Sequence, residues 1–193
     1  MGDHNKRDKN KSLTYLLFNK PYGVLCQFTD QVGRNTLKDY IHFKGVYSVG
    51  RLDMDTEGLL LLTNDGDVNH WLASSKNRMY KTYWAQVEGV PSDEQIYELR
   101  HGILLDGAKT LPAKVKWIDE PKLWERPKSI RFRKSVPTSW LEISIMEGKN
   151  RQVRKMTAAV NLPCLRLVRI AFGPLLLGDI KPGRFIMIPK PRI

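Results

Sequence analysis

The segment from Gly50 to Gly66 constrains this chain more than any other part of its sequence. Three carboxylates and an arginine lie between Gly50 and Gly58, and four consecutive leucines follow directly at 59–62. The turn residues Asn64-Asp65-Gly66 after the leucines predict that the leucines form a buried strand. Because unpaired carboxylates at the edge of a core are costly, this segment indicates a site with a chemical purpose.

The charge of the chain narrows the class of partner. Lys and Arg total 32 against 20 Asp and Glu, which gives a net charge of +12. Basic residues gather in segments 122–134 and 149–155, and Arg166 and Arg169 follow soon after. Each run alone is typical of a solvated face. Several runs under a strong net positive charge favour a nucleic-acid partner.

Other features of the composition exclude several classes of protein. A hydrophobic fraction of 41% with 27% charged residues favours a folded core over disorder. No apolar run approaches the roughly 20 residues that span a bilayer, and the polar start lacks the apolar stretch of a signal peptide. Cys26 and Cys164 are too isolated for a disulfide framework or a zinc knuckle. We therefore expect a cytoplasmic protein with no membrane partner, in which residues 1–12 form a flexible basic tail.

Hydrophobic periodicity and turn residues predict an α+β chain in which strands outnumber short helices. The expected strands are 13–18, 46–49, 59–63, 79–87, 113–118, 140–146, 165–172 and 185–188. The expected helices are 36–41, 67–73, 92–100 and 150–160. Ser92 followed by Gln95 is typical of a capping box. Segment 120–139, rich in proline and basic residues, is expected to be a mobile surface loop, and the balance of elements predicts a mixed or antiparallel sheet.

Two metal-dependent interpretations of the acidic segment fit poorly. Asp53, Asp55, Glu57 and Gly58 match the first half of an EF-hand loop, but position 12 of that loop is Asn64 instead of a bidentate glutamate. A phosphohydrolase would place its nucleophilic aspartate at the end of a continuous apolar strand, with a second aspartate for Mg²⁺. Here a glycine, an arginine and a single leucine precede Asp53 instead.

The acidic segment also resembles the central motif of the pseudouridine synthases, in the branch named for ribosomal small subunit pseudouridine synthase A. The motif reads Gly-Arg-Leu-Asp-x-Asp-Thr-x-Gly-Leu at 50–59. Three other motifs occur in the family's order: Asn-Lys-Pro-Tyr-Gly at 19–23, Lys-Thr-Tyr at 81–83 and Gly-Lys-Asn-Arg-Gln-Val-Arg-Lys-Met at 148–156. Many members carry an S4-type RNA-binding domain before the opening motif. Because that motif begins at Asn19 here, we expect no S4 domain.

The resemblance implies a pseudouridine synthase fold, with a largely antiparallel sheet in two lobes, short flanking helices and a central active-site cleft. Residues 13–193 would form a single bilobal catalytic domain. The implied reaction converts a uridine of ribosomal RNA, expected to be 23S RNA of the large subunit, to pseudouridine, without a metal or other cofactor. We expect the protein to be a monomer. A non-catalytic RNA-binding or ribosome-assembly protein on the same fold remains the alternative.

The resemblance assigns catalytic roles to Asp53, Tyr83 and Arg154. Asp53 supplies the carboxylate beside the sugar and base, and it is open whether it attacks the sugar, attacks the base or forms a glycal. The ring of Tyr83 can stack on uracil, and its hydroxyl can relay the C5 proton. Arg154 is expected to pair with Asp53 and to orient it. Asp55 is expected to make structural hydrogen bonds to turn amides instead.

Six basic residues are expected to contact RNA phosphates rather than to take part in the chemistry. They are Lys20, Arg51, Lys81, Lys149, Arg151 and Lys155. Arg51 is also a candidate to fill the gap that a uridine leaves when it flips out of an RNA helix. Lys20 is a candidate to position the opening motif.

Overall fold

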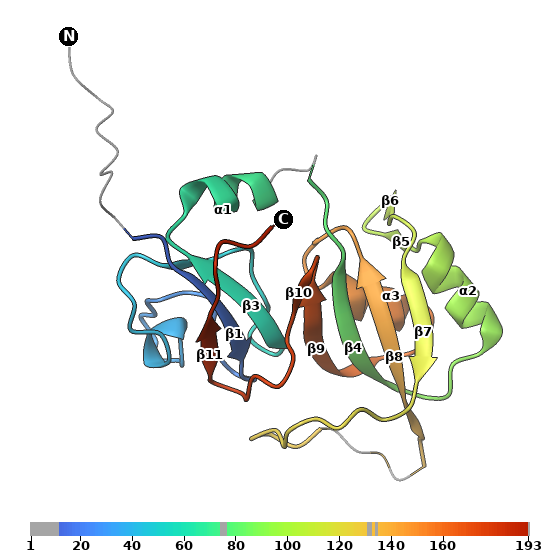
Figure 1. The fold of residues 1–193 in the computed structure, drawn as a ribbon. Helices are drawn as coiled ribbons and strands as arrows, with labels where there is room; N and C mark the ends of the chain where they lie inside the picture. The colour runs from blue at the N-terminus through green and yellow to red at the C-terminus, as the bar shows by residue number, and fades with distance from the viewer. Residues whose placement is uncertain (1–11, 74–76, 131–132, 134, 193) are drawn as a thin grey trace.

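Nine strands join in one sheet in the computed structural model, which describes residues 12–73, 77–130, 133 and 135–192. The strands of the main path are β1 (Tyr15–Lys20), β3 (Glu57–Thr63), β4 (Lys81–Glu88), β7 (Lys114–Ile118), β8 (Thr138–Ile145), β9 (Cys164–Phe172) and β11 (Phe185–Met187). Their order is β11-β1-β3-β9-β4-β8-β7, as Figure 1 shows. Of the pairs in this path, β3 with β9 is parallel and the others are antiparallel, which confirms the predicted α+β class and mixed, largely antiparallel sheet.

The remaining elements are short. Strands β2 (Tyr47–Ser48) and β10 (Leu175–Leu176) extend the sheet, and β5 (Leu104–Leu105) pairs with β6 (Ala108–Lys109). Two-residue strands such as β5, β6 and β10 carry no periodic signal, so the sequence analysis missed these three. The N-terminal tail expected at 1–12 lies outside the described residues, apart from Ser12.

The helices lie close to their predicted positions. They are α1 (Gly66–Ala73), α2 (Asp93–His101) and α3 (Gln152–Ala159), and the predicted helix at 36–41 is a single 3-10 turn, Leu37–Asp39. The capping box at the start of α2 is confirmed, because the Gln95 amide donates to Ser92 Oγ at 3.2 Å and the Ser92 amide donates to Gln95 Oε1 at 2.9 Å. None of the helices in the described part of the chain is long and apolar enough to cross a membrane.

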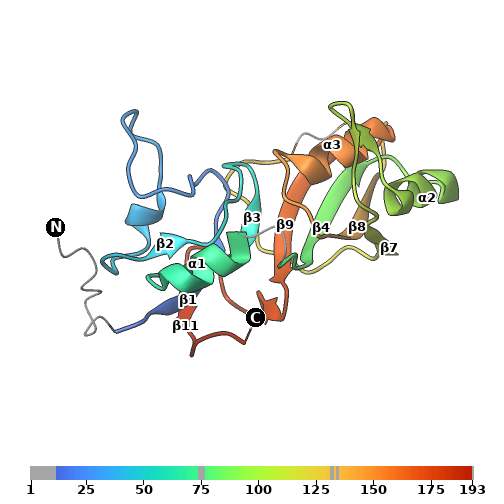
Figure 2. The ribbon, with the colours of Figure 1, turned by 90° about the horizontal axis from the view of Figure 1, so that it is seen from above.

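Strands β1 and β3 are buried on both faces. Leu60 and Leu62 pack with α2, α3 and the segment that follows β1, whereas Leu59 and Leu61 pack with α1 on the opposite face. Figure 2 shows this arrangement from above, with α3 on one face of the sheet and α1 on the other. Because alternate side chains of a strand point to opposite faces, a strand between two apolar layers needs a continuous apolar run. This explains the four consecutive leucines.

The two halves of the sheet meet where β3 lies parallel to β9. The register pairs there are Glu57 with Val168 and Gly58 with Arg169. Gly58 has a φ of +101°, and a Cβ at this position would overlap the backbone of Arg169. The glycine that ends the acidic motif therefore permits the close approach of the two strands.

A buried ion pair lies at the same junction. Arg166 donates to both carboxylate oxygens of Glu57, at 2.9 and 3.0 Å, and both side chains are almost fully buried. The indole of Trp124 also donates to Glu57, at 2.8 Å, and the Arg126 guanidinium lies 4.2 Å from the centre of the Tyr22 ring. Segment 120–130, expected to be part of a surface loop, thus connects β7 to residues of the other half of the sheet.

The carboxylate of Asp65 holds the two ends of the described chain together. It accepts hydrogen bonds from the Tyr15 hydroxyl at 2.6 Å and from the amides of Asp67 and Val68 in α1, and it pairs with Lys190 at 3.0 Å. Burial alone would raise the pKa of Asp65, but these bonds outweigh burial and lower it to about 2.

Replacing Asp65 with Asn should therefore reduce stability most at neutral pH. The carboxylate contributes fully above the pKa of an unfolded aspartate, about 3.9, and loses this contribution as the pH falls through the folded value of about 2. Urea midpoints of the wild type and the variant should consequently converge between about pH 4 and about pH 2. A gap that stays constant as the solution is acidified would contradict this role for Asp65.

Candidate active site

The acidic segment forms a loop, residues 50–56, that several distant segments hold in place. The Leu52 amide donates to Cys26 Sγ at 3.2 Å, and the Met54 carbonyl accepts from the Gly23 amide at 2.8 Å. Within the loop, the Thr56 amide donates to the Asp53 carbonyl at 3.0 Å and closes a turn. The opening and central motifs, well separated in sequence, are thus in direct contact.

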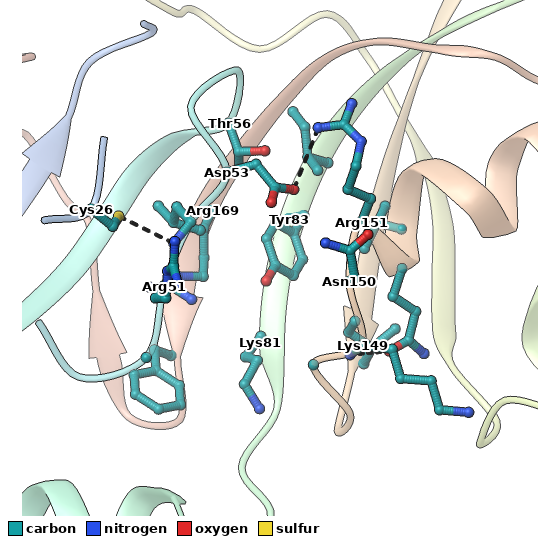
Figure 3. Close-up of a pocket in the computed structure, with 18 of the residues that line it drawn as sticks. Cys26, Arg51, Asp53, Thr56, Lys81, Tyr83, Lys149, Asn150, Arg151 and Arg169 are labelled. Atoms are coloured by element: carbon teal, nitrogen blue, oxygen red, sulfur yellow. Dashed lines mark hydrogen bonds and ion pairs between the residues drawn. The ribbon is translucent and has the colours of Figure 1, made fainter. Parts of the chain in front are cut away.

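A pocket of about 660 Å³ opens beside this loop. One wall is the loop itself, the floor is formed by β4 and β9, and the opposite wall is the segment 148–153 that leads into α3. Asp53, Tyr83 and Arg151 all line it, as Figure 3 shows. Three of the four motifs therefore meet in a single pocket, and the predicted central cleft is present.

Asp53 faces Arg151 across the pocket. The distance from Arg151 Nη1 to Asp53 Oδ2 is 3.7 Å, and about a third of the Asp53 side chain is exposed. Arg151 also makes two hydrogen bonds to the Asp55 carboxylate, at 2.9 and 2.8 Å. These bonds raise the pKa of Arg151 and, together with Arg154, lower the pKa of Asp55 despite its partial burial. The two carboxylates thus share one bidentate arginine.

The backbone of Arg151 is unusual. This residue precedes the first turn of α3 and adopts a left-handed conformation, with φ of 50° and ψ of 32°. A non-glycine residue in this conformation is strained and is often found at functional sites. The conformation directs Arg151 toward the acidic loop instead of along the helix.

The predicted pairing of Arg154 with Asp53 is wrong in this structure. Arg154 Nη2 donates to the Asp55 carbonyl at 2.8 Å, Nη1 donates to the Cys164 carbonyl at 3.2 Å, and Nε lies 3.4 Å from Asp55 Oδ2. Its side chain is mostly buried behind the loop and does not line the pocket. Asp55, expected to bond turn amides, is engaged by the two arginines instead.

The six residues predicted to bind RNA fall into two groups. Arg51, Lys81, Lys149 and Arg151 line the pocket. Lys155 lies outside it and pairs with Asp106 at 2.6 Å.

Lys20 is fully buried, which corrects its prediction as an RNA contact. Its ammonium donates to the carbonyls of Pro21, Val24 and Met54, at 2.9, 2.8 and 3.4 Å. Burial lowers its pKa to about 8, although the nearby acidic groups oppose the shift. Lys20 therefore joins the opening motif to the acidic loop, as the alternative prediction for this residue proposed.

The sequence analysis missed Arg169 as a site residue. Arg169 is almost fully buried, lines the pocket, and lies directly opposite Tyr83 in the β4–β9 ladder. The sequence showed it only as one member of a basic cluster, because its position beside Tyr83 depends on strand pairing. No group of three or more His, Cys, Asp or Glu that could hold a metal ion occurs in the described ranges.

Comparison with known proteins identifies the family. Residues 14–159 match the family described as RNA pseudouridylate synthase. Ribosomal large subunit pseudouridine synthase E of Vibrio parahaemolyticus is 53% identical over 170 residues, which cover 88% of this chain and 71% of that protein. The protein of the same name from Xanthomonas axonopodis is 51% identical over 170 residues, which cover 86% of this chain and 90% of that protein.

A solved structure agrees with the sequence relatives. A crystal structure of a pseudouridylate synthase superposes with a TM-score of 0.78 and 27% identity, covering 94% of this chain and 72% of that one. The family match, the fold and the motif order thus point in one direction. The chain belongs to the RNA pseudouridylate synthase family and is an enzyme that isomerises uridine to pseudouridine.

Proposed function

We propose that this enzyme converts a specific uridine of large-subunit ribosomal RNA, 23S RNA, to pseudouridine. The names of the relatives from Vibrio and Xanthomonas support this substrate, as does the net charge of +12. We also propose that it acts as a monomer. Every residue that lines the pocket comes from a single chain, so one copy supplies a complete site.

The observation that carries the proposal is the content of the pocket. A partly exposed carboxylate, Asp53, faces a cation, Arg151, and an aromatic ring, Tyr83, contributes to the same cavity. The rim adds Arg51 and Lys149, which suit a polyanion that approaches from solvent. A site built only to hold RNA has no use for an acidic group at its centre.

In the proposed mechanism the target uridine leaves the RNA stack and enters the pocket, and Arg51 fills the vacated space. The carboxylate of Asp53 acts beside the ribose and uracil while the bond between C1′ and N1 breaks. The base rotates, a bond forms between C1′ and C5, C5 loses its proton, and N1 gains one. The product is therefore an isomer of the substrate. Tyr83 stacks on the ring and relays the C5 proton.

The two arginines of the final motif take different roles in this mechanism. Arg151 lies within ion-pair distance of Asp53 and orients its carboxylate. Arg154 bonds the backbone of the acidic loop and of β9, so it acts as a positioning residue behind the pocket. This division supports transferring the Asp53 partner role from Arg154, to which the family resemblance assigned it, to Arg151.

The experiment that tests the proposal measures release of the C5 hydrogen. Unmodified 23S transcripts carrying tritium at uridine C5 are incubated with the protein in excess EDTA. We expect one tritium to be released per target uridine at a rate that chelation does not change, provided that the RNA remains folded. Loss of activity in EDTA that Mg²⁺ restores without any change in RNA folding would favour a metal-dependent reaction instead.

The same samples separate catalysis from binding alone. A gel shift without tritium release, on 23S RNA and on intact and partly assembled large subunits, would favour the alternative of a non-catalytic RNA-binding protein. Release from small-subunit RNA but not from 23S RNA would retain the enzyme and overturn the proposed substrate.

A further inference from the structure

Arg169 is a buried cation with no anionic partner in the described part of the chain. Its Nε donates to the Leu59 carbonyl at 2.7 Å, and its side chain has no ion pair with a described carboxylate. Its Nη2 is buried without a hydrogen-bond partner among the described residues. Burying a guanidinium without a counter-charge is unfavourable, so a group of this kind is expected to meet its anion in a ligand.

A β-bulge directs Arg169 into the pocket. In the β4–β9 ladder Lys81 lies opposite Phe172 and Thr82 opposite Ala171, but Tyr83 lies opposite Arg169. One residue of β9, Ile170, is therefore extra, and the register shifts between Thr82 and Tyr83. Bulges commonly redirect a side chain next to an active site. Here the bulge makes Arg169 the cross-strand neighbour of Tyr83 on the pocket face.

A second cation, Lys81, stands beside Arg169. Lys81 is two residues before Tyr83 on β4, so its side chain lies on the same face. The ring of Phe172 is flanked by both cations, with Lys81 Nζ 5.6 Å and Arg169 Cζ 5.5 Å from its centre. Burial, and then the charge of Arg169, lowers the pKa of Lys81. Two like charges held close together in a partly dry place favour binding of an anion between them.

A second pocket of about 420 Å³ continues the first one beyond Lys81. The two pockets share part of their lining: Leu72, Lys81, Gly148, Lys149 and Phe172. The second pocket adds the thioethers of Met79 and Met146 and the amide of Asn77. Sulfur and aromatic groups pack well against a flat ring, and an amide can bond a base edge. Glu147 also lines this pocket, but its carboxylate is engaged by Gln152 at 2.7 Å and by the Leu111 amide at 2.9 Å.

We propose that Lys81 and Arg169 bind the phosphodiester that links the target uridine to its neighbour, and that the neighbouring base occupies the second pocket. This inference rests on the proposed function, because it takes the uridine to lie at Tyr83. A flipped uridine then carries the next nucleotide with it along β4. The second pocket would make the enzyme sensitive to the base beside its target as well as to the target itself.

The test scans the charges of a bound RNA. An RNA fragment that the enzyme binds is prepared with one methylphosphonate, which is uncharged, at each linkage in turn. Dissociation constants are measured for the wild type, for Lys81→Met and for the control Lys116→Met, an exposed lysine outside both pockets. One linkage adjacent to the modified uridine should weaken wild-type and control binding about tenfold and leave Lys81→Met nearly unchanged.

The neighbouring base and Arg169 are tested in the same format. An abasic nucleotide across that linkage should weaken wild-type binding about tenfold, and Met146→Ala should lose most of this sensitivity. Arg169→Lys keeps a charge in place of the buried guanidinium, and circular dichroism shows whether it folds. If it is folded, it should be less sensitive to the same methylphosphonate than the wild type is.

Each outcome decides between the two proposals. If the effects of Lys81→Met and of every methylphosphonate simply multiply, or if the coupled linkage lies away from the modified uridine, the phosphate site is overturned while tritium release still supports the enzyme. An abasic effect that Met146→Ala leaves intact would overturn the second pocket as the base site. If coupling at one linkage appears without tritium release from any ribosomal RNA, the anion site stands and the proposed function fails.

Discussion

Replacing Asp53 with Asn is expected to reduce tritium release by at least about 1,000-fold. Asparagine has nearly the same shape as aspartate and can still accept a hydrogen bond, but it carries no charge and is a poor nucleophile and base. Because Asp53 is partly exposed and the loop around it is held by backbone contacts, the variant should fold normally. Its affinity for RNA should stay within about threefold of the wild type, since phosphate binding uses the basic residues.

A matched control separates the loss of this carboxylate from a general loss of acidic charge. Asp179→Asn makes the same substitution at an exposed position outside the pocket and should retain full activity. If Asp53→Asn turned over at a rate within about tenfold of the wild type, Asp53 would not be the central catalytic group. Asp55 would then become the leading candidate, because it shares Arg151 with Asp53.

Replacing Glu57 with Gln is expected to lower the free energy of unfolding by about 3–5 kcal/mol. The change keeps the size of the side chain but leaves the buried guanidinium of Arg166 without its anionic partner. Removing one member of a buried pair is strongly destabilising because the remaining charge stays out of water. Urea denaturation followed by circular dichroism measures the change, and activity of the folded variant should fall less than in Asp53→Asn.

The ion pair between Lys155 and Asp106 provides the comparison. Its N–O distance of 2.6 Å is shorter than that of the Glu57 pair, but the Asp106 side chain is 77% exposed. Asp106→Asn should therefore change the stability by no more than about 1 kcal/mol. Equal losses in the two variants would mean that burial at the β3–β9 junction is not what makes the Glu57 pair important.

Local chemistry in the sequence was sufficient to predict most of the fold. Turn residues and side-chain alternation predicted the eight longer strand segments, and the Ser92 capping box predicted the start of α2 within one residue. These features depend on neighbours a few residues away. The order of the four motifs, together with the family resemblance, was enough to predict the pocket and the presence of Asp53 and Tyr83 within it.

Tertiary structure decided which charged group meets which. Arg151 and Arg154 are three residues apart in one motif, so spacing alone places them on neighbouring parts of a helix face. The left-handed backbone of Arg151 and its contact with a loop almost a hundred residues earlier determine that it faces Asp53. Lys20 read as a surface cation, yet three backbone carbonyls from the loops around it enclose its ammonium.

The same distinction explains Arg169 and the second pocket. The sequence by itself determined the strands, the motifs and the basic charge, because these follow from local propensity and composition. Only the tertiary structure decided that a bulge in β9 sets Arg169 beside Tyr83 and that Glu57 is neutralised by Arg166. Burial and ion pairing depend on segments that are distant in the chain, and their energies exist only once those segments have packed together.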